Sequence, residues 1–260
     1  ENVRGLLSAN KGLAIETIIN DFRSLKPGYL VIPKLVNFSS YGLPQIRERV
    51  LIFGIRKDTE FDILFPAYTH GLNKFPLTSS KIGLEAIAAE VPNQEHMNIQ
   101  PRTIEILKRI PAGENFNAID KDDPYYVKGM ISHVYRRLHP DEPSKTLIAS
   151  GGGGTWGYHY AEPRALTNRE RARLQGFPDD FVFEGKFGEI RKQIGNAVPP
   201  VGILRFVNSV TAFFNEEHKT CDLNKVDEHI PRFSIKNLMA RSNSDLNFYA
   251  SELVSDDLFF

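Results

Sequence analysis

The chain has 260 residues, of which 41% are hydrophobic and 25% charged, and its 32 Lys and Arg residues balance 32 Asp and Glu residues. This composition is typical of a globular protein, and the length allows two domains with sizeable cores. No apolar run approaches the roughly 20 residues that cross a membrane. The single cysteine, Cys221, excludes a disulfide framework and a cysteine-based zinc site, so we expect no metal and a reducing, cytoplasmic compartment.

The neutral total hides an uneven distribution of charge. Residues 216–260 carry nine acids and five bases, which leaves 27 bases and 23 acids in residues 1–215. This mild excess permits a local basic groove for a nucleic acid, although an excess of this size more often reflects an ordinary solvated surface.

The first elements predict the end of an α/β sheet. The chain starts without an initiator methionine or a signal-peptide pattern, so we expect it to begin inside a longer protein. Apolar residues recur at helical spacing over residues 11–25, after Asn10 as an N-cap. Residues 29–38 are typical of a strand interrupted by Pro33, and residues 49–55 of a buried strand.

The rest of the chain predicts a smaller, loop-rich domain followed by regular helices. Short elements separated by Pro and Gly follow residue 57, with helical patches at 80–90 and 102–110. A Thr-x-x-Glu capping box at Thr167 opens a short helix, and Pro199-Pro200 starts a longer one. The predicted segments are therefore 1–57, 58–163, 164–215 and an acidic extension at 216–260.

Two polar segments have side chains suited to binding. Gln45, Arg47 and Arg49 share one side of an extended segment by its two-residue period, where they suit an anion or a base edge. The alternative is a pair of surface arginines bound to Glu48. Near the C-terminal end, residues 193–200 place a polar turn at a helix N-terminus, which attracts an anion, and a plain helix cap is the alternative.

A third segment interleaves bases, aromatic residues and glycines, as a loop that reads a nucleic-acid groove would. An ordinary aromatic turn fits the composition about as well, and the strand-then-helix context of a dinucleotide loop is missing. The candidate residues for DNA contact are Arg136, Arg137, Gly151, Gly152, Gly153, Gly154, Thr155 and Trp156.

Five blocks occur in a characteristic order. They are Glu1-Asn2-Val3, Gln45-x-Arg47-x-Arg49, Thr146-Leu147 before the glycine run, the block at 164–178, and the block at 194–199. This order resembles the C-terminal half of bacterial DNA cytosine-5 methyltransferases of the restriction-modification type. The resemblance implies an α/β fold: the C-terminal part of a Rossmann-like, S-adenosylmethionine-dependent methyltransferase sheet, with a small loop-rich target recognition domain at 58–163 and a return to the catalytic domain at 164–215.

The resemblance also implies a reaction. Enzymes of this family flip the target cytosine out of the duplex, add a cysteine thiolate to C6 and methylate C5 from S-adenosylmethionine. The ring must accept negative charge, which requires an acid at N3 and a cation at O2. By the match, Glu1 is the acid, Arg49 binds O2, Gln45 and Arg47 order their surroundings, Asn196 and Ala197 lie at the methionine portion of the cofactor, and Thr146 contacts a backbone phosphate.

The sequence departs from the family at its start. The Gly-rich cofactor loop and the Pro-Cys nucleophile lie upstream of Glu-Asn-Val in the family and are not in this sequence, and Cys221 follows the last family block. We therefore expect double-stranded DNA and an N-terminal catalytic half, in cis or in trans, as partners, with no activity of this chain alone. A DNA-binding specificity module without catalysis is the main alternative, and a relative acting on transfer RNA is a weaker one.

Overall fold

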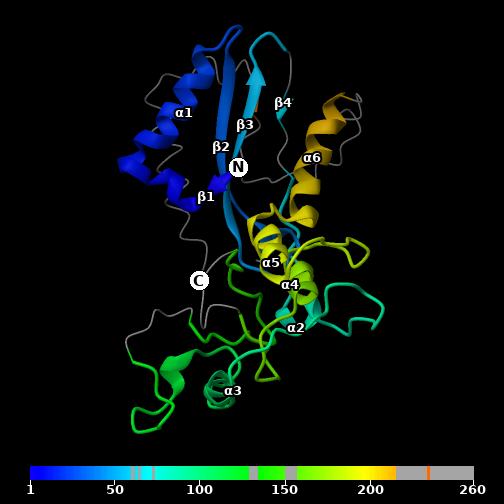
Figure 1. Cartoon of the computed structure of the whole chain (residues 1–260). Helices are drawn as coiled ribbons and strands as arrows, with labels where there is room; N and C mark the ends of the chain where they lie inside the picture. The colour runs from blue at the N-terminus through cyan, green and yellow to red at the C-terminus, as the bar shows by residue number, and fades with distance from the viewer. Residues whose placement is uncertain are drawn as a thin grey trace. The chain divides into compact units, whose positions relative to one another are not determined.

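The computed structural model describes residues 1–59, 62–63, 66–71, 74–128, 134–149, 157–214 and 233–234 (Figure 1). The chain forms two compact units. Unit 1 comprises Glu1–Asn37, Glu48–Tyr68 and the chain from Leu204 onward, and unit 2 comprises Phe38–Arg47 and Thr69–Ile203. The predicted domain boundaries stay a prediction, although unit 2 includes residues 164–203 together with most of the predicted second domain.

The secondary structure consists of short elements. The strands are β1 (Asn2–Val3), β2 (Tyr29–Asn37), β3 (Glu48–Arg56), β4 (Asp62–Ile63) and β5 (Phe233–Ser234). The α-helices are α1 (Leu13–Ser24), α2 (Ser80–Gly83), α3 (Pro101–Lys108), α4 (Asn168–Leu174), α5 (Phe187–Asn196) and α6 (Pro200–Phe214). Short 3-10 helices are η1 (Arg4–Leu7), η2 (Ala9–Gly12), η3 (Phe38–Tyr41) and η4 (Phe116–Ala118).

Unit 1 contains a three-stranded antiparallel sheet in the order β1-β3-β2. Both long strands predicted from the sequence are confirmed. Pro33 lies in β2, an outer strand of this described sheet, where a missing N–H group is tolerated. β3 lies between the other two strands, so Arg49 pairs with Val3 on one side and Val36 on the other.

Helix α1 lies beside β2 (Figure 1) and begins later than the sequence predicts. The prediction of Asn10 as its N-cap is wrong, because Asn10 has a positive φ of 50° within η2 and the N-cap is Gly12 at φ 91°. Glycine adopts that left-handed conformation without a Cβ penalty. Within α1, Ile15 is buried, whereas Leu13 and Phe22 are 52% and 42% exposed. Much of the predicted apolar face is therefore open to solvent.

Unit 2 confirms the helical patch at 102–110 as α3, but the patch at 80–90 forms only the single turn of α2. Gly83, a poor helix former, is the last residue of α2. Helix α5 was not predicted, because Gly188 and Gly195 interrupt an amphipathic pattern that otherwise buries Ile190 and Ile194.

The core of unit 2 consists of several buried apolar clusters. One joins leucines from well-separated segments, and a second surrounds the end of α3. Their members are Leu84, Leu138, Leu147, Leu166 and Leu174 in the first, and Ile106, Ile110, Phe116, Ile119 and Val134 in the second.

The capping box predicted at the start of α4 is confirmed. The Thr167 hydroxyl accepts from the Glu170 N–H at 3.1 Å, and the Glu170 carboxylate accepts from the Thr167 N–H at 2.8 Å. Both Glu170 oxygens also accept from Arg164, each at 2.8 Å. The helix stops before Gly176, which has a φ of +83°.

The Glu170 network predicts a pH-dependent stability. Burial alone would raise the pKa of Glu170, but its hydrogen bonds with Arg164 and Thr167 lower the pKa below the usual 4.5. A depressed acid pKa stabilises the folded state at neutral pH, and the contribution is lost as the pH falls below about 4.5. Glu170→Gln should lower the unfolding free energy by about 1–3 kcal/mol at pH 7.

The measurement is chemical denaturation of both proteins at pH 7 and at more acidic values, where the difference between them should shrink. Glu162→Gln is the matched control, because Glu162 binds the same Arg164 but is exposed, and it should have little effect. A difference for Glu170→Gln that stays constant with pH would contradict the assignment.

Candidate active site

Glu1 and Arg49 form an ion pair at the edge of the unit 1 sheet. Val3 of β1 lies opposite Arg49 of β3, and Glu1 directly precedes β1. Arg49 Nε lies 3.5 Å from Glu1 Oε2, and the side chains are 12% and 29% exposed.

Neighbouring groups affect Arg49 but do not compete with Glu1 for an ion pair with it. Burial lowers the pKa of Arg49, and the Glu1 carboxylate opposes that shift. Arg49 Nη1 also donates to the Glu48 carbonyl at 2.7 Å. The Glu48 carboxylate instead binds Arg4 at 3.0 Å. The alternative that the arginines pair with the Glu48 side chain at the surface is therefore wrong.

Gln45 and Arg47 are buried in unit 2, with exposed fractions of 0% and 1%. Gln45 Nε2 donates to the Gln175 side chain at 2.8 Å, and Gln45 Oε1 accepts from the Leu147 N–H at 3.1 Å. Arg47 Nη2 donates to the carbonyls of Gly195 and Ala197 at 2.8 and 3.0 Å. These two side chains join backbone segments far apart in the sequence.

Two residues of this network received no role from the sequence. Gln175 Nε2 donates to the Ala197 carbonyl at 2.6 Å, so Gln175 connects Gln45 to the same turn that Arg47 holds. Gly195 packs so closely on Ala149 that a Cβ atom would clash with the Ala149 backbone. Both residues lie in blocks that carry the family resemblance, and this position in the sequence was the feature from which a role could have been predicted.

Asn196 and Ala197 lie at the end of α5 and not inside a longer turn as predicted. Asn196 is the last residue of the helix and is exposed, and Ala197 is its C-cap. The turn before α6 is therefore short, and the Ala197 carbonyl is fixed by two donors. The exposed Asn196 amide can both donate and accept hydrogen bonds.

The residues predicted to contact DNA have different surroundings. Thr146 is exposed, and its hydroxyl donates to the Ile46 carbonyl at 2.8 Å. Arg136 is half-buried and donates to the Gly113 carbonyl at 3.2 Å. The residues Gly151, Gly152, Gly153, Gly154, Thr155 and Trp156 lie outside the described residues.

Arg137 is 8% exposed and serves the interior of unit 2. Its guanidinium donates to backbone carbonyls of Leu107, Ile110, His159 and Tyr160 at 2.5–3.2 Å. These donors are used within the protein, so the Arg137 guanidinium joins backbone segments of unit 2.

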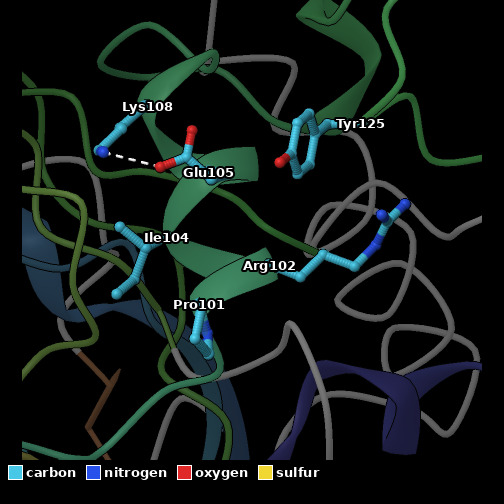
Figure 2. Close-up of a pocket in the computed structure, with 6 residues that line it drawn as sticks. All are labelled: Pro101, Arg102, Ile104, Glu105, Lys108 and Tyr125. Carbon is cyan, nitrogen blue, oxygen red and sulfur yellow. Dashed lines mark hydrogen bonds and ion pairs between the residues drawn. The ribbon is translucent and has the colours of Figure 1, made fainter.

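A cavity of about 430 Å³ in unit 2 is lined by none of the predicted site residues. It lies along α3, where Tyr125 from another segment faces the helix and Lys108 binds Glu105 (Figure 2). Across the described residues, no group of three or more His, Cys, Asp or Glu side chains is placed to hold a metal ion. None of the described helices has the length and apolarity needed to span a bilayer.

The family model for C-5 cytosine-specific DNA methylases matches residues 1–211. The chain belongs to this family. It is 52% identical over 229 residues to the type II methyltransferase M.NgoFVII of Neisseria gonorrhoeae, covering 86% of this chain and 61% of that protein. It is 46% identical over 218 residues to the type II methyltransferase M.BbvI of Brevibacillus brevis, covering 82% of this chain and 58% of that protein.

Solved structures agree on the fold. A DNA modification methyltransferase encoded within an Escherichia coli prophage matches with a TM-score of 0.56 at 19% identity, covering 82% of this chain and 68% of that one. The chain therefore shares its fold with that structure, in agreement with its family membership. The chain spans about three fifths of the length of the two type II methyltransferases.

Proposed function

We propose that this chain is the C-terminal portion of a site-specific DNA cytosine-5 methyltransferase. In this proposal an N-terminal half, in cis or in trans, supplies the Pro-Cys nucleophile and the Gly-rich cofactor loop. Family membership and the incomplete coverage of the relatives support it. The observation that carries it furthest is the pairing of Glu1 with Arg49.

This pair suits the edge of a flipped cytosine. N3 and O2 are neighbouring acceptors on one edge of the ring, and an acid beside a guanidinium offers each of them one donor. As the nucleophile adds to C6, electron density moves toward N3 and O2. Glu1 would protonate N3 and Arg49 would donate to O2, so both side chains stabilise charge that develops during the reaction.

The turn after α5 fits the methionine portion of S-adenosylmethionine. The exposed Asn196 amide offers both a donor and an acceptor, and the Ala197 backbone is held in place by Arg47 and Gln175. S-adenosylmethionine, when bound, supplies an electrophilic methyl group. Gln45 and Arg47 then act as positioning residues, because they fix the turn from inside the protein.

Exposed apolar side chains support the need for an N-terminal half. Leu13, Phe22 and Leu25 on or beside α1 are 52%, 42% and 52% exposed, and Val207 and Val210 on α6 are 47% and 39% exposed. Groups of exposed apolar residues commonly mark surfaces covered by another part of a protein. We therefore assign these faces to contacts with the missing part of the catalytic domain.

We further propose that double-stranded DNA contacts the segment around the glycine run. Thr146 and Arg136 precede the run in the sequence and supply polar groups. The run itself consists of Gly151, Gly152, Gly153, Gly154, Thr155 and Trp156. Glycines allow a backbone to approach base edges, and arginines bind phosphates or guanine. The recognised sequence depends on this segment in the proposal.

A complementation assay tests the proposed function. Methyl transfer from labelled S-adenosylmethionine to DNA of mixed sequence should be absent with this chain alone and present when the N-terminal half is added. Cys221→Ser should leave the activity of the complete enzyme unchanged. Methylation by the chain alone would contradict the proposal, and sequence-specific DNA binding without methylation by both halves together would favour a specificity module.

A further inference from the structure

Arg171 is a buried cation that forms no ion pair among the described residues. It lies on α4 and is 2% exposed, and its Nε and Nη2 atoms have no hydrogen-bond partner among the described residues. The adjacent Glu170 attracts the Arg171 charge, but both Glu170 oxygens are hydrogen-bonded to Arg164 and not to Arg171. Burial lowers the pKa of Arg171 to about 9, with Arg191 contributing, so the guanidinium stays charged at neutral pH.

A second cation and a hydroxyl without a hydrogen-bond partner also lie near Arg171. Arg191 is close enough to lower the Arg171 pKa by repulsion. Burial raises the pKa of the neighbouring Tyr158 hydroxyl, so Tyr158 stays neutral, and that hydroxyl also has no hydrogen-bond partner among the described residues. An uncompensated buried charge is costly, which makes an anion the favourable ligand here.

A small cavity lies at this position within unit 2. Its volume is about 110 Å³, enough for a few water molecules or one tetrahedral oxyanion. Arg171 and Gly157 contribute to its lining together with the segment 144–148. The Ser144 hydroxyl is buried and has no partner among the described residues, whereas Lys145 and Thr146 are exposed. The exposed Glu142 is the acidic member of the lining.

We propose that this cavity binds one phosphate oxyanion, with Arg171 as the buried charge and Ser144 and Lys145 as further donors. The proposal rests on the proposed function for its most direct source of phosphate, the backbone of the bound DNA. A phosphate contact positions DNA without reading its sequence, so the site would raise affinity for all duplexes equally. Free inorganic phosphate shares the same chemistry and is the other source.

Arg171→Met in the full-length protein tests the site, because Met retains an apolar stem and removes the charge. Sodium phosphate should raise the melting temperature of the unsubstituted protein above that in sodium chloride of equal ionic strength. The substitution should reduce this difference to the general stabilisation that phosphate gives a folded protein by its exclusion from the surface. In phosphate-free buffer the variant should be at least as stable as the unsubstituted protein, since a buried unpaired charge has been removed.

DNA binding separates the two sources of phosphate. If the ligand is a backbone phosphate, Arg171→Met should weaken binding about 10- to 100-fold on every duplex. It should also reduce the slope of log affinity against log salt concentration by about 0.9. Loss of phosphate stabilisation with an unchanged slope would support the oxyanion site and assign it to a free anion.

Arg169→Met is the matched control on the same helix. Arg169 is 0% exposed, but its guanidinium donates to the carbonyls of Pro92, Pro178 and Phe181. This variant should lose stability and keep both the phosphate effect and the salt slope. Lys145 is exposed, so Lys145→Ala should weaken the phosphate effect and leave the melting temperature in phosphate-free buffer unchanged.

The proposal is overturned if Arg171→Met keeps the full phosphate stabilisation and the full salt slope, or if it is destabilised in phosphate-free buffer as a partnered arginine would be. A failure of the proposed function would be seen elsewhere, as an unsubstituted full-length protein that does not methylate DNA. Since the phosphate measurement does not require methylation, the two failures are distinguishable.

Discussion

Glu1→Gln in the complete enzyme is expected to slow the chemical step of methylation by about 100- to 10,000-fold, the usual contribution of one general acid. Glutamine keeps the size of the side chain and can still donate a hydrogen bond, but it cannot transfer a proton to N3. DNA binding should therefore remain close to that of the unsubstituted enzyme. Single-turnover methylation and DNA affinity, measured on the same preparation, test both parts of this expectation.

Glu48→Gln provides the matched control for Glu1. Glu48 is another partly exposed glutamate of the same sheet, but its carboxylate binds Arg4, and the rate should stay nearly unchanged. Arg49→Ala should reduce both the rate and the retention of the flipped base, because it removes a charge-assisted hydrogen bond. A Glu1→Gln enzyme with the unsubstituted single-turnover rate would remove Glu1 from the active site.

Arg47→Met is expected to lower the unfolding free energy by about 2–5 kcal/mol, because the carbonyls of Gly195 and Ala197 lose a buried, charged donor. The affinity for S-adenosylmethionine should fall as well, since the turn before α6 loses one of its supports. Chemical denaturation and a cofactor titration of the full-length protein measure the two effects.

The control for Arg47 is Arg56→Met on β3. Arg56 is exposed and pairs with Asp58 at the surface, so neither stability nor cofactor affinity should change measurably. An Arg47→Met protein as stable as the unsubstituted one would show that the two hydrogen bonds are not needed to hold the turn.

The fold could be predicted where the signal is local. The capping box of Thr167 and Glu170 lies within one helical turn, and the apolar run that predicts β3 lies within the strand itself. Helix α5 escaped prediction because its glycines weaken helix propensity while its stability comes from burial of Ile190 and Ile194 against other segments. Tertiary packing of this kind leaves no trace in a short sequence window.

The candidate site could also be predicted only in part. The pairing of Glu1 with Arg49 agrees with the prediction that both act on one base, and their roles in catalysis stay a proposal. Arg137 shows the limit of charge patterns. Beside aromatic residues and glycines it is typical of a DNA contact, yet its donors bind four carbonyls from distant segments. A sequence does not reveal which carbonyls converge on a given guanidinium.

The segment 45–47 has a consequence for how two ligands influence each other. On one side, Gln45 and Ile46 bind the backbone at Leu147 and Ser144, and on the other, Arg47 holds the turn at Ala197. In the proposed enzyme these are the ends that face DNA and cofactor. Three consecutive residues would then connect the DNA site to the cofactor site. Because such coupling is reciprocal, bound DNA would change the affinity for the cofactor by the same factor as bound cofactor changes the affinity for DNA.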